Sequence, residues 1–458
     1  MAQAHHHLGL TLRELGRGEE ALPFLGRALE LRPAFAEAAL DLAGSLDELG
    51  RIEEAAACLE SLLERQPELA EARTNLAGVL CKLDRFQEAI RQLELAVRQQ
   101  RGLAPAWNNL GARYERLGRI EQAIACYRQA LAIAPHFAEA HLNLGMALLL
   151  TGRFPEGWQH YEWRLTQRGP RWERYRRPLW DGANPSGLRI LLVAEQGLGD
   201  TLQFVRYVPW LANLGALVYL ECPWRLTPLL RSLPGLARLI PAGTVLPDYD
   251  VFLPLMSLPG RLGTGLDNIP ADVPYLSVPQ HLVARWQAWL DREASGLRVG
   301  LCWASNASAK SARLRSLSLA QLLDVLGVDG ITFFSLQRGP QAAEISGLPP
   351  GMRVVDLEAH ASGILDTAAG IMNLDLVISV DTMVAHLAGA MARPVWTLLP
   401  FAADFRWMLG REDSPWYPTM RLFRQPAPGD WAGVIRELAG ELILWRASRE
   451  AQRNAQCS

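Results

Sequence analysis

The residues best suited to chemistry gather in short polar stretches, each of which follows an apolar run typical of a buried β-strand. The first stretch extends from Glu195 to Phe204 and follows the apolar run Arg189–Ala194. Its glycines, Gly197 and Gly199, predict a tight turn, and Thr201 begins an amphipathic helical run. At such a junction the free backbone N–H groups and the positive end of the helix dipole favour an anionic or polar ligand.

Asp200 lies at this junction, and two interpretations of it stay open. Asp is a preferred N-cap residue, so this side chain can simply cap the helix that follows. It also lies at the carboxyl end of a predicted strand, which is where open α/β folds bind their ligands.

A second stretch, Trp303–Ser316, contains Lys310, Arg313 and Arg315 after another predicted strand. Guanidinium and ammonium groups suit a diphosphate, whose oxygens accept several hydrogen bonds, although a solvated basic loop has the same composition. Gln337 follows the apolar run Ile331–Leu336 and is a weaker candidate for reading a base or ribose edge.

The third stretch, Ile378–Ala390, carries the strongest signal. A strand ends at Asp381, Thr382 is in position to cap a helix of small residues, and His386 follows one turn later. Small residues let that helix lie close to a sheet, and its N-terminus suits a phosphate. A buried core histidine is the alternative for His386, but its place beside Asp381 favours a ligand contact.

The elements that position these stretches begin with a repeat of 34 residues in the first third of the chain. This period resembles the tetratricopeptide repeat, in which each unit is a pair of antiparallel helices. Such stacks present a groove that binds peptides or partner proteins, but a rigid spacer or a dimerisation arm stays possible. The matching positions are Gly16, Gly50, Asp84, Gly118 and Gly152; Ala21, Ala55, Ala89, Ala123 and Gly157; Pro33, Pro67, Arg101 and Pro135; and Gly9, Ala43, Ala77, Gly111 and Gly145. A polar ladder along the groove is expected from Asp41, Asn75, Asn109 and Asn143.

After Ser186 short apolar strands alternate with helices, which predicts parallel sheets covered on both faces. We expect a helical-repeat domain over 1–165 and a connector over 166–187 that docks onto the next domain through Pro178, Leu179 and Trp180. Two facing doubly wound domains are expected over 188–290 and 291–458. The last helix, Asp430–Arg449, is expected to cross back onto the first of these sheets or to lie on the surface. The predicted strands are Arg189–Ala194, Leu217–Glu221, Tyr249–Leu253, Arg298–Trp303, Ile331–Leu336, Leu374–Ser379 and Val395–Leu399.

Composition narrows the function classes. A net charge of −2 over 458 residues gives no electrostatic case for a nucleic-acid or bilayer partner. The chain has no apolar run of transmembrane length, and the N-terminus lacks the pattern of a secretory signal. Its six cysteines are scattered without metal-ligand spacing, which favours reduced thiols and a cytoplasmic location.

Two motifs together resemble the lipopolysaccharide heptosyltransferase superfamily: GLGDTLQF at Gly197–Phe204 and DTMVAHLAGA at Asp381–Ala390. The order of repeats, PLWDG at Pro178–Gly182 and SPWYP at Ser414–Pro418 is similar to bacterial tetratricopeptide-repeat glycosyltransferases of that group. The resemblance implies the GT-B fold, which consists of two facing Rossmann-like domains, here after an all-α repeat solenoid.

The resemblance also implies roles for particular residues. Asp200 matches the proposed general base, with Gly197, Gly199 and Thr201 in the same loop. Asp381, Thr382 and His386 match residues at the donor sugar and diphosphate. The resemblance further implies phosphate contacts from the basic loop, by Lys310 or Arg313 and by Arg315. Met383 stands where heptosyltransferases usually have glycine, and Ala309, Ser311 and Ala312 replace polar residues of the repeat-bearing relatives.

The function expected from these features is an inverting glycosyltransferase that uses a nucleotide-diphosphate sugar and requires no metal or other cofactor. The repeats would recruit a protein or glycan acceptor, or a peptide partner. The alternative is an inactive repeat scaffold with a vestigial GT-B region. The sequence leaves the sugar, the base, the acceptor and the oligomeric state open.

Overall fold

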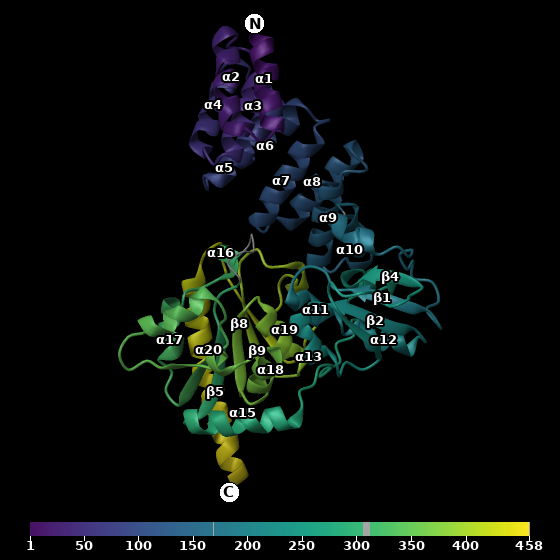
Figure 1. Cartoon of the computed structure of the whole chain (residues 1–458). Helices are drawn as coiled ribbons and strands as arrows, with labels where there is room; N and C mark the ends of the chain where they lie inside the picture. Colours follow the sequence, from purple (N-terminus) through teal and green to yellow (C-terminus); the bar gives the residue numbers. More distant parts are fainter. Residues whose placement is uncertain (168, 306–311, 458) are drawn as a thin grey trace. The chain divides into compact units, whose positions relative to one another are not determined.

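A computed structural model describes residues 1–167, 169–305 and 312–457 of the chain. The chain divides into two compact units (Figure 1). The first comprises Met1–Leu148 with His160–Gln167, and the second comprises Leu149–Gln159 with Arg168–Ser458. Every helix of the described residues is too short or too polar to span a bilayer.

The repeat region is built from antiparallel helix pairs whose turns match the regular spacing of the sequence repeat. Residues Gly16, Gly50 and Gly118 all adopt positive φ at these turns, and Asp84 does so at φ 58°. Glycine tolerates this left-handed conformation freely, and Asp is among the few other residues that enter it readily. The helices are α1 (Ala2–Glu14), α2 (Gly18–Leu31), α3 (Ala36–Glu48), α4 (Ile52–Arg65), α5 (Ala70–Lys82), α6 (Phe86–Gln99), α7 (Ala104–Arg116), α8 (Ile120–Ile133), α9 (Ala138–Leu150), α10 (Phe154–Tyr161) and the 3₁₀ helix η1 (Glu162–Gln167).

Small residues let the paired helices approach closely. A Cβ atom at Gly111 of α7 would lie 2.6 Å from the ring of Tyr127 on α8, closer than atoms can pack. Tyr127 itself is fully buried, and its hydroxyl donates to Glu115 at 2.8 Å. The glycine at this repeat position therefore makes room for a large buried ring.

The first sheet of the second unit has the strand order β3-β2-β1-β4, with every neighbouring pair parallel. Its strands are β1 (Arg189–Val193), β2 (Leu217–Cys222), β3 (Leu236–Pro241) and β4 (Val251–Pro254). The residues before β1 pack against this sheet, as the connector prediction expects: Leu179 forms a bridge with Phe252, and the backbone N–H of Trp180 donates to the Phe252 carbonyl at 2.9 Å. Tyr175 joins the same core.

The second sheet has the order β10-β9-β8-β5-β6-β7, again entirely parallel. Its strands are β5 (Leu297–Cys302), β6 (Ile331–Ser335), β7 (Val354–Asp356), β8 (Leu376–Val380), β9 (Val395–Leu399) and β10 (Met420–Arg424). Strand β8 is buried along its whole length, which explains its continuous apolar run. The prediction of an α/β region after an all-α region is therefore confirmed.

Three strands escaped the sequence prediction: β3, β7 and β10. Strand β3 is half-exposed at an edge of the first sheet. Strands β7 and β10 form the two edges of the second sheet; β7 has 3 residues, and the apolar residues of β10 are interrupted by Arg421 and Arg424. Edge strands lack the continuous apolar run that marks a central parallel strand. The remaining elements are η2 (Pro170–Arg174), α11 (Leu198–Phe204), α12 (Tyr207–Asn213), η3 (Trp224–Leu226), α13 (Thr227–Leu230), η4 (Leu255–Ser257), α14 (Leu258–Arg261), α15 (Gln280–Glu293), α16 (Ala312–Arg315), η5 (Leu319–Leu322), α17 (Leu323–Leu326), η6 (Pro340–Gly347), η7 (Glu358–His360), α18 (Ile364–Met372), α19 (Met383–Ala390), η8 (Phe405–Trp407) and α20 (Trp431–Cys457).

Two helices differ from their predicted form. The helical run predicted to begin at Thr201 is divided into two helices, α11 and α12, because Pro209 has no N–H for the carbonyl of Val205 four residues earlier. The last helix, α20, does not cross back onto the first sheet. Its buried side chains, Val434 and Leu438 among them, belong to the core of the second sheet.

The two sheets of the second unit meet through α11 and α19, which lie side by side (Figure 1). A Cβ atom at Gly199 would lie 2.8 Å from the His386 ring, so glycine is needed for this approach. Nearby, the buried Arg206 donates to the Trp416 carbonyl at 2.5 Å and to the Tyr275 hydroxyl at 3.0 Å. Its guanidinium also lies 4.5 Å from the centre of the Tyr417 ring. The motif around Asp200 and the SPWYP segment therefore meet through one buried cation.

The close packing at Gly111 generates a stability prediction. We expect Gly111→Ala to lower the free energy of unfolding of the repeat unit by about 1–3 kcal/mol, because the new methyl group displaces the Tyr127 ring. Gly78→Ala in α5 is the matched control, since a Cβ there meets nothing within 4 Å. That variant should gain about 0.5–1 kcal/mol from helix propensity. Urea unfolding followed by circular dichroism measures both, and equal effects would contradict the packing argument.

Candidate functional site

A pocket of about 1020 Å³ lies in the second unit, at the carboxyl ends of strands from both sheets. This is the edge at which open parallel sheets bind ligands. The first sheet contributes the loop Gln196–Asp200 after β1 and Pro223–Arg225 after β2. The second sheet contributes Cys302 at the end of β5 and residues that follow β5, β6, β7, β8 and β9: Ala304, Ser305, Arg315, Leu336–Gln341, Glu358, Asp381–Val384, His386, Asp404 and Arg406. The volume suffices for a ligand of nucleotide-sugar size.

Asp200 lies in this pocket, but it is not the N-cap that its position in the sequence suggests. The N-cap of α11 is Gly197, and Asp200 is three residues further along. Its Oδ2 accepts the Gly197 N–H at 2.7 Å, and its Oδ1 accepts from the guanidinium of Arg406. The N–H group of Gly197 is therefore used by the protein itself. Thr201 is buried beneath the loop, where its hydroxyl donates to the Gly197 carbonyl at 3.3 Å.

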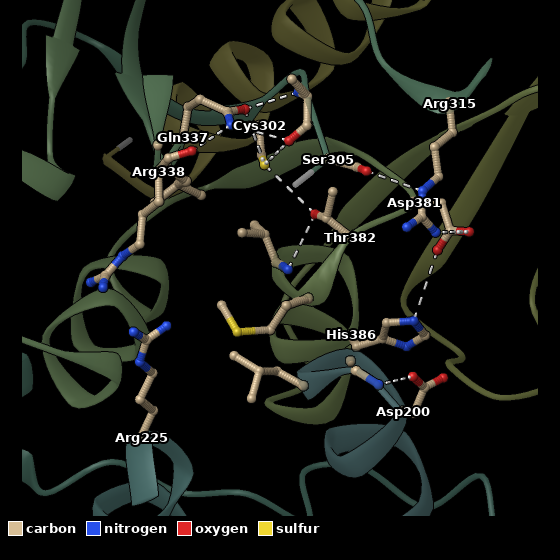
Figure 2. A pocket seen from close by; sticks show the side chains of 18 of the residues that line it. Asp200, Arg225, Cys302, Ser305, Arg315, Gln337, Arg338, Asp381, Thr382 and His386 are labelled. Atoms are coloured by element: carbon tan, nitrogen blue, oxygen red, sulfur yellow. Dashed lines mark hydrogen bonds and ion pairs between the residues drawn. The ribbon is translucent and has the colours of Figure 1, made fainter. Parts of the chain in front are cut away.

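The basic stretch after β5 is represented in the pocket by Arg315. Its Nε donates to the Ser305 hydroxyl at 3.2 Å, and its Nη1 lies 3.7 Å from Oδ2 of Asp381 (Figure 2). Lys310 lies outside the described residues, and the side chain of Arg313 lies outside the described side chains. The described part of the loop thus supplies one cation beside a buried carboxylate.

Gln337 lies in the pocket, but its amide group is occupied by the backbone. Its Oε1 accepts from the N–H groups of Trp303 and Ala304 at 3.1 and 2.9 Å. Its Nε2 donates to the carbonyls of Ala304 and Arg338 at 3.1 and 2.9 Å. Both amide protons are therefore used, which argues against the predicted contact with a base. The Gln337 side chain instead joins the loops after β5 and β6.

Asp381, Thr382 and His386 come together after β8 (Figure 2). Thr382 is the N-cap of α19, as its position in the sequence predicts, and its hydroxyl accepts the Val384 N–H at 3.3 Å. His386 is buried: its Nδ1 lies 3.0 Å from the Tyr417 hydroxyl and its Nε2 lies 3.9 Å from Oδ1 of Asp381. Burial and the nearby arginines hold the pKa of His386 well below its ordinary value, so the imidazole is neutral.

Asp381 differs electrostatically from an ordinary aspartate. Burial, together with repulsion from the carboxylate of Asp404, raises the pKa of Asp381 to about 6. The neighbouring thiol is inert, because burial raises the pKa of Cys302 to about 11. A buried acid that titrates near neutrality in a pocket is the kind of group that often marks a functional site.

Five charged residues of the pocket were absent from the predicted site: Arg225, Arg338, Glu358, Asp404 and Arg406. Arg225 and Arg338 extend into the pocket from the two sheets (Figure 2). Arg338 pairs with Glu358, whereas Arg225 has no ion-pair partner among the described residues and lies 5.6 Å from the Trp224 ring. Their position in the sequence could have identified them, because each of the five follows a strand at its carboxyl end.

The triplet Asp248-Tyr249-Asp250 has the spacing of a metal-binding Asp-x-Asp motif and was also overlooked. Both carboxylates pair with Arg189, at 2.8 Å for Asp248 and 2.7 Å for Asp250. The hydrogen bonds from Arg189 lower the pKa of Asp250 to about 2. These side chains join β1 to the segment before β4, and they are absent from the pocket lining. Among the described residues, no three His, Cys, Asp or Glu side chains are grouped as a metal site.

Comparison with known proteins bears mainly on the first unit. The tetratricopeptide-repeat family matches residues 12–68, 68–136 and 116–157. The N-terminal unit is a tetratricopeptide-repeat solenoid. A relative with a related sequence is Protein FlbA of Caulobacter vibrioides, which is 30% identical over 329 residues. That match covers 66% of this chain and 54% of FlbA, so the chain spans about half the length of its curated relative.

Solved structures of repeat proteins match about a third of the chain. A crystal structure of MamA is 25% identical and covers 34% of this chain and 92% of its own, with a TM-score of 0.31. A thermophilic TPR protein of Thermus thermophilus is 29% identical and covers 36% and 91%, with a TM-score of 0.33.

The raised pKa of Asp381 predicts how stability depends on pH. The folded state holds its proton up to about pH 6, whereas the unfolded chain releases it near pH 4, so stability falls as pH rises between these values. Asp381→Asn should remove this loss. The free energy of unfolding of the variant, relative to that of the wild type, should therefore rise by up to about 3 kcal/mol between about pH 4 and pH 7. Urea unfolding at a series of pH values measures the difference.

Asp413→Asn is the matched control for this experiment. Hydrogen bonds from Arg411 lower the pKa of Asp413, so its contribution to stability is lost as pH falls, which is the opposite sign. A difference between Asp381→Asn and wild type that stays constant with pH would contradict the assignment.

Proposed function

We propose that the second unit is an inverting glycosyltransferase of the GT-B type that uses a nucleotide-diphosphate sugar. The observation that carries the proposal is that a carboxylate of the first sheet, Asp200, lines the same pocket as Arg315, Thr382 and the N-terminus of α19 from the second. A base on one side and an anion-binding helix end on the other match the needs of sugar transfer from a diphosphate.

In the proposed reaction, Asp200 accepts the proton of an acceptor hydroxyl as the oxygen attacks the anomeric carbon. The bond from that carbon to the diphosphate breaks, and its electron pair leaves with the phosphate oxygen. Attack from the face opposite the leaving group inverts the anomeric centre. Removal of the hydroxyl proton by a positioned base accelerates such steps by about 10²–10⁴-fold.

The departing diphosphate gathers negative charge, which the second sheet is equipped to stabilise. Helix α19 presents its N-terminal N–H groups and the positive end of its dipole toward the pocket. Arg315 adds a guanidinium, and Arg338 and Arg225 extend the positive charge along the pocket. Donors fixed in place before the reaction stabilise a leaving group without reorganisation.

The protonation state of Asp381 affects how well the pocket binds a phosphate group. A neutral Asp381 can donate to a phosphate oxygen, whereas an ionised one repels it. Because its pKa is about 6, the protonated form is available in the range where the phosphates of a nucleotide sugar remain anionic. The neutral His386 beside it is held by Tyr417 and stacks on Trp407 with 5.4 Å between the ring centres.

The repeat unit is proposed to recruit the acceptor or a protein partner through the groove that such stacks present. The polar ladder expected there is partly occupied. Asp41 pairs with His6 at 2.7 Å and with Arg13 at 3.2 Å, and Asn143 donates to Asn108 at 3.0 Å. Asn75 is exposed and is available to a ligand. We therefore favour the middle repeats for polypeptide recognition.

A second candidate function is a protein-interaction scaffold whose α/β unit has lost catalysis. The specific observation in its favour is the contact of Asp200 with Arg406, since the candidate base carries an ion-pair partner. The substitutions at Ala309, Ser311 and Ala312 point the same way. Turnover of a nucleotide sugar decides between the two functions.

The role of Asp200 predicts a loss of turnover without a loss of binding. Asp200→Asn should lower kcat by at least about 100-fold, because the amide cannot accept the acceptor proton. Binding of the nucleotide sugar, measured by titration calorimetry, should stay within about threefold of wild type, since the proposal assigns no donor contact to Asp200. Equal activity of Asp200→Asn and wild type would contradict the proposed base.

Arg315 predicts the complementary result, a loss of binding. In a thermal-shift screen, a nucleotide diphosphate at 100 times its Kd should stabilise the wild type by about 2.7 kcal/mol. Arg315→Met should weaken binding about tenfold, so the same ligand concentration gives about 1.4 kcal/mol. Arg231→Met, which removes an exposed arginine outside the pocket, is the matched control and should behave as wild type. No stabilisation of the wild type by any nucleotide would favour the scaffold.

A further inference from the structure

Arg406 holds the candidate base from the opposite sheet. It belongs to η8, which follows β9 of the second sheet, and its side chain is 7% exposed. Its Nε donates to Oε1 of Gln203 at 2.7 Å, and its Nη2 donates to Oδ1 of Asp200. Both acceptors lie on α11 of the first sheet, so one buried guanidinium spans the two halves of the unit.

The geometry of this contact depends on the shape of the arginine side chain. Asp200 and Gln203 are three residues apart on α11, so their side chains lie on one face of the helix. The Nε–H and one Nη–H of a guanidinium form a planar edge with two parallel donors. That edge meets both acceptors together, whereas the single ammonium of a lysine cannot reproduce the planar fork.

Arg406 is also held in place by its neighbours in the segment that follows β9. The remaining Nη1 donates to Oδ1 of Asp404 at 2.7 Å, and the same oxygen accepts the Arg406 backbone N–H at 3.0 Å. The preceding Phe405 is covered edge-on by Trp158, with 5.9 Å between ring centres. The next helical residue, Trp407, is fully buried beneath His386. The guanidinium therefore has little freedom to follow Asp200 if α11 moves.

The two oxygens of Asp200 are consequently held by different halves of the unit. Oδ2 is bound by the Gly197 N–H of its own loop, and Oδ1 is bound by Arg406 of the second sheet. One contact exists wherever the loop is folded. The other requires α11 and η8 to be packed together.

We propose that Arg406 is a positioning residue, which orients the carboxylate of Asp200 for proton abstraction when the two sheets are packed against each other. The inference rests on the proposed glycosyltransferase function and adds to it the residue that completes the base. Separation of the sheets would remove the Arg406 contact and leave Asp200 with the Gly197 contact. The carboxylate would therefore be oriented for proton abstraction only in the packed arrangement, which also brings α19 to the pocket.

A double-mutant cycle with Asp200→Asn and Arg406→Met in the full chain tests the proposal. Arg406→Met alone should lower kcat by about 100-fold, the effect of a misplaced catalytic group, while KM for the nucleotide sugar changes by less than about threefold. In the Asp200→Asn background the same substitution should have no further effect on kcat, because Arg406 acts through Asp200. Arg406→Lys should restore only a small part of the activity, since it lacks the fork.

Unfolding of the four proteins of the cycle, which are the wild type, the two single variants and the double variant, gives a test that does not depend on turnover. The unfolding equilibrium constant of the double variant should differ by about tenfold from the value expected if the two single substitutions acted independently, as is typical of residues in contact. Arg411→Met is the matched control, because Arg411 pairs with Asp413 outside the pocket and should change kcat little.

The outcomes separate this proposal from the proposed function. Additive unfolding effects, an unchanged kcat in Arg406→Met, or a rise in KM at constant kcat would each overturn the positioning role, the last by making Arg406 a donor-binding residue. If the two substitutions are coupled in unfolding but the wild-type protein shows no turnover, the glycosyltransferase is refuted and Arg406 is only a structural bridge between the sheets. Normal turnover with no coupling would leave the glycosyltransferase intact and refute only the positioning role.

Discussion

The close approach of α11 to α19 is the constraint on which the rest of the α/β unit depends. Gly199 lies so near His386 that a Cβ atom at position 199 would come within 2.8 Å of the buried imidazole ring and displace it. Around this contact the interface is closed by Arg206, whose charge is satisfied by the Trp416 carbonyl, the Tyr275 hydroxyl and aromatic rings. Because the helices follow β1 and β8, their contact places the strand ends of two sheets around one pocket.

The electrostatics of the pocket follow from that packing. Burial withdraws water from several carboxylates and guanidinium groups together, so each depends on its neighbours more strongly than it would at the surface. Asp381 responds with a raised pKa, and His386 stays neutral. Asp200 is instead held by hydrogen bonds from Gly197 and Arg406. Two aspartates of one pocket thus have different surroundings, which are set by the packing around each of them.

The repeat unit is organised by a different principle, in which each helix pair is specified by its own short segment. Turn residues such as Gly50 and Asp84 adopt the left-handed conformation, and Pro67 follows the end of α4. Stacked repeats expose an extended surface, which suits recognition of another protein more readily than chemistry.

The sequence by itself determined the features that depend on neighbours along the chain. These are the period of the repeats, the central parallel strands, the Thr382 cap and the gathering of Asp381, Thr382 and His386 after one strand. Tertiary structure alone decided the partners of the charged side chains. Arg406 meets Asp200 across 206 positions of sequence, and the amide of Gln337 is used by backbone groups more than 30 residues away. Local patterns cannot encode such pairs, because the distance between two side chains in the fold is set by how whole helices and sheets pack.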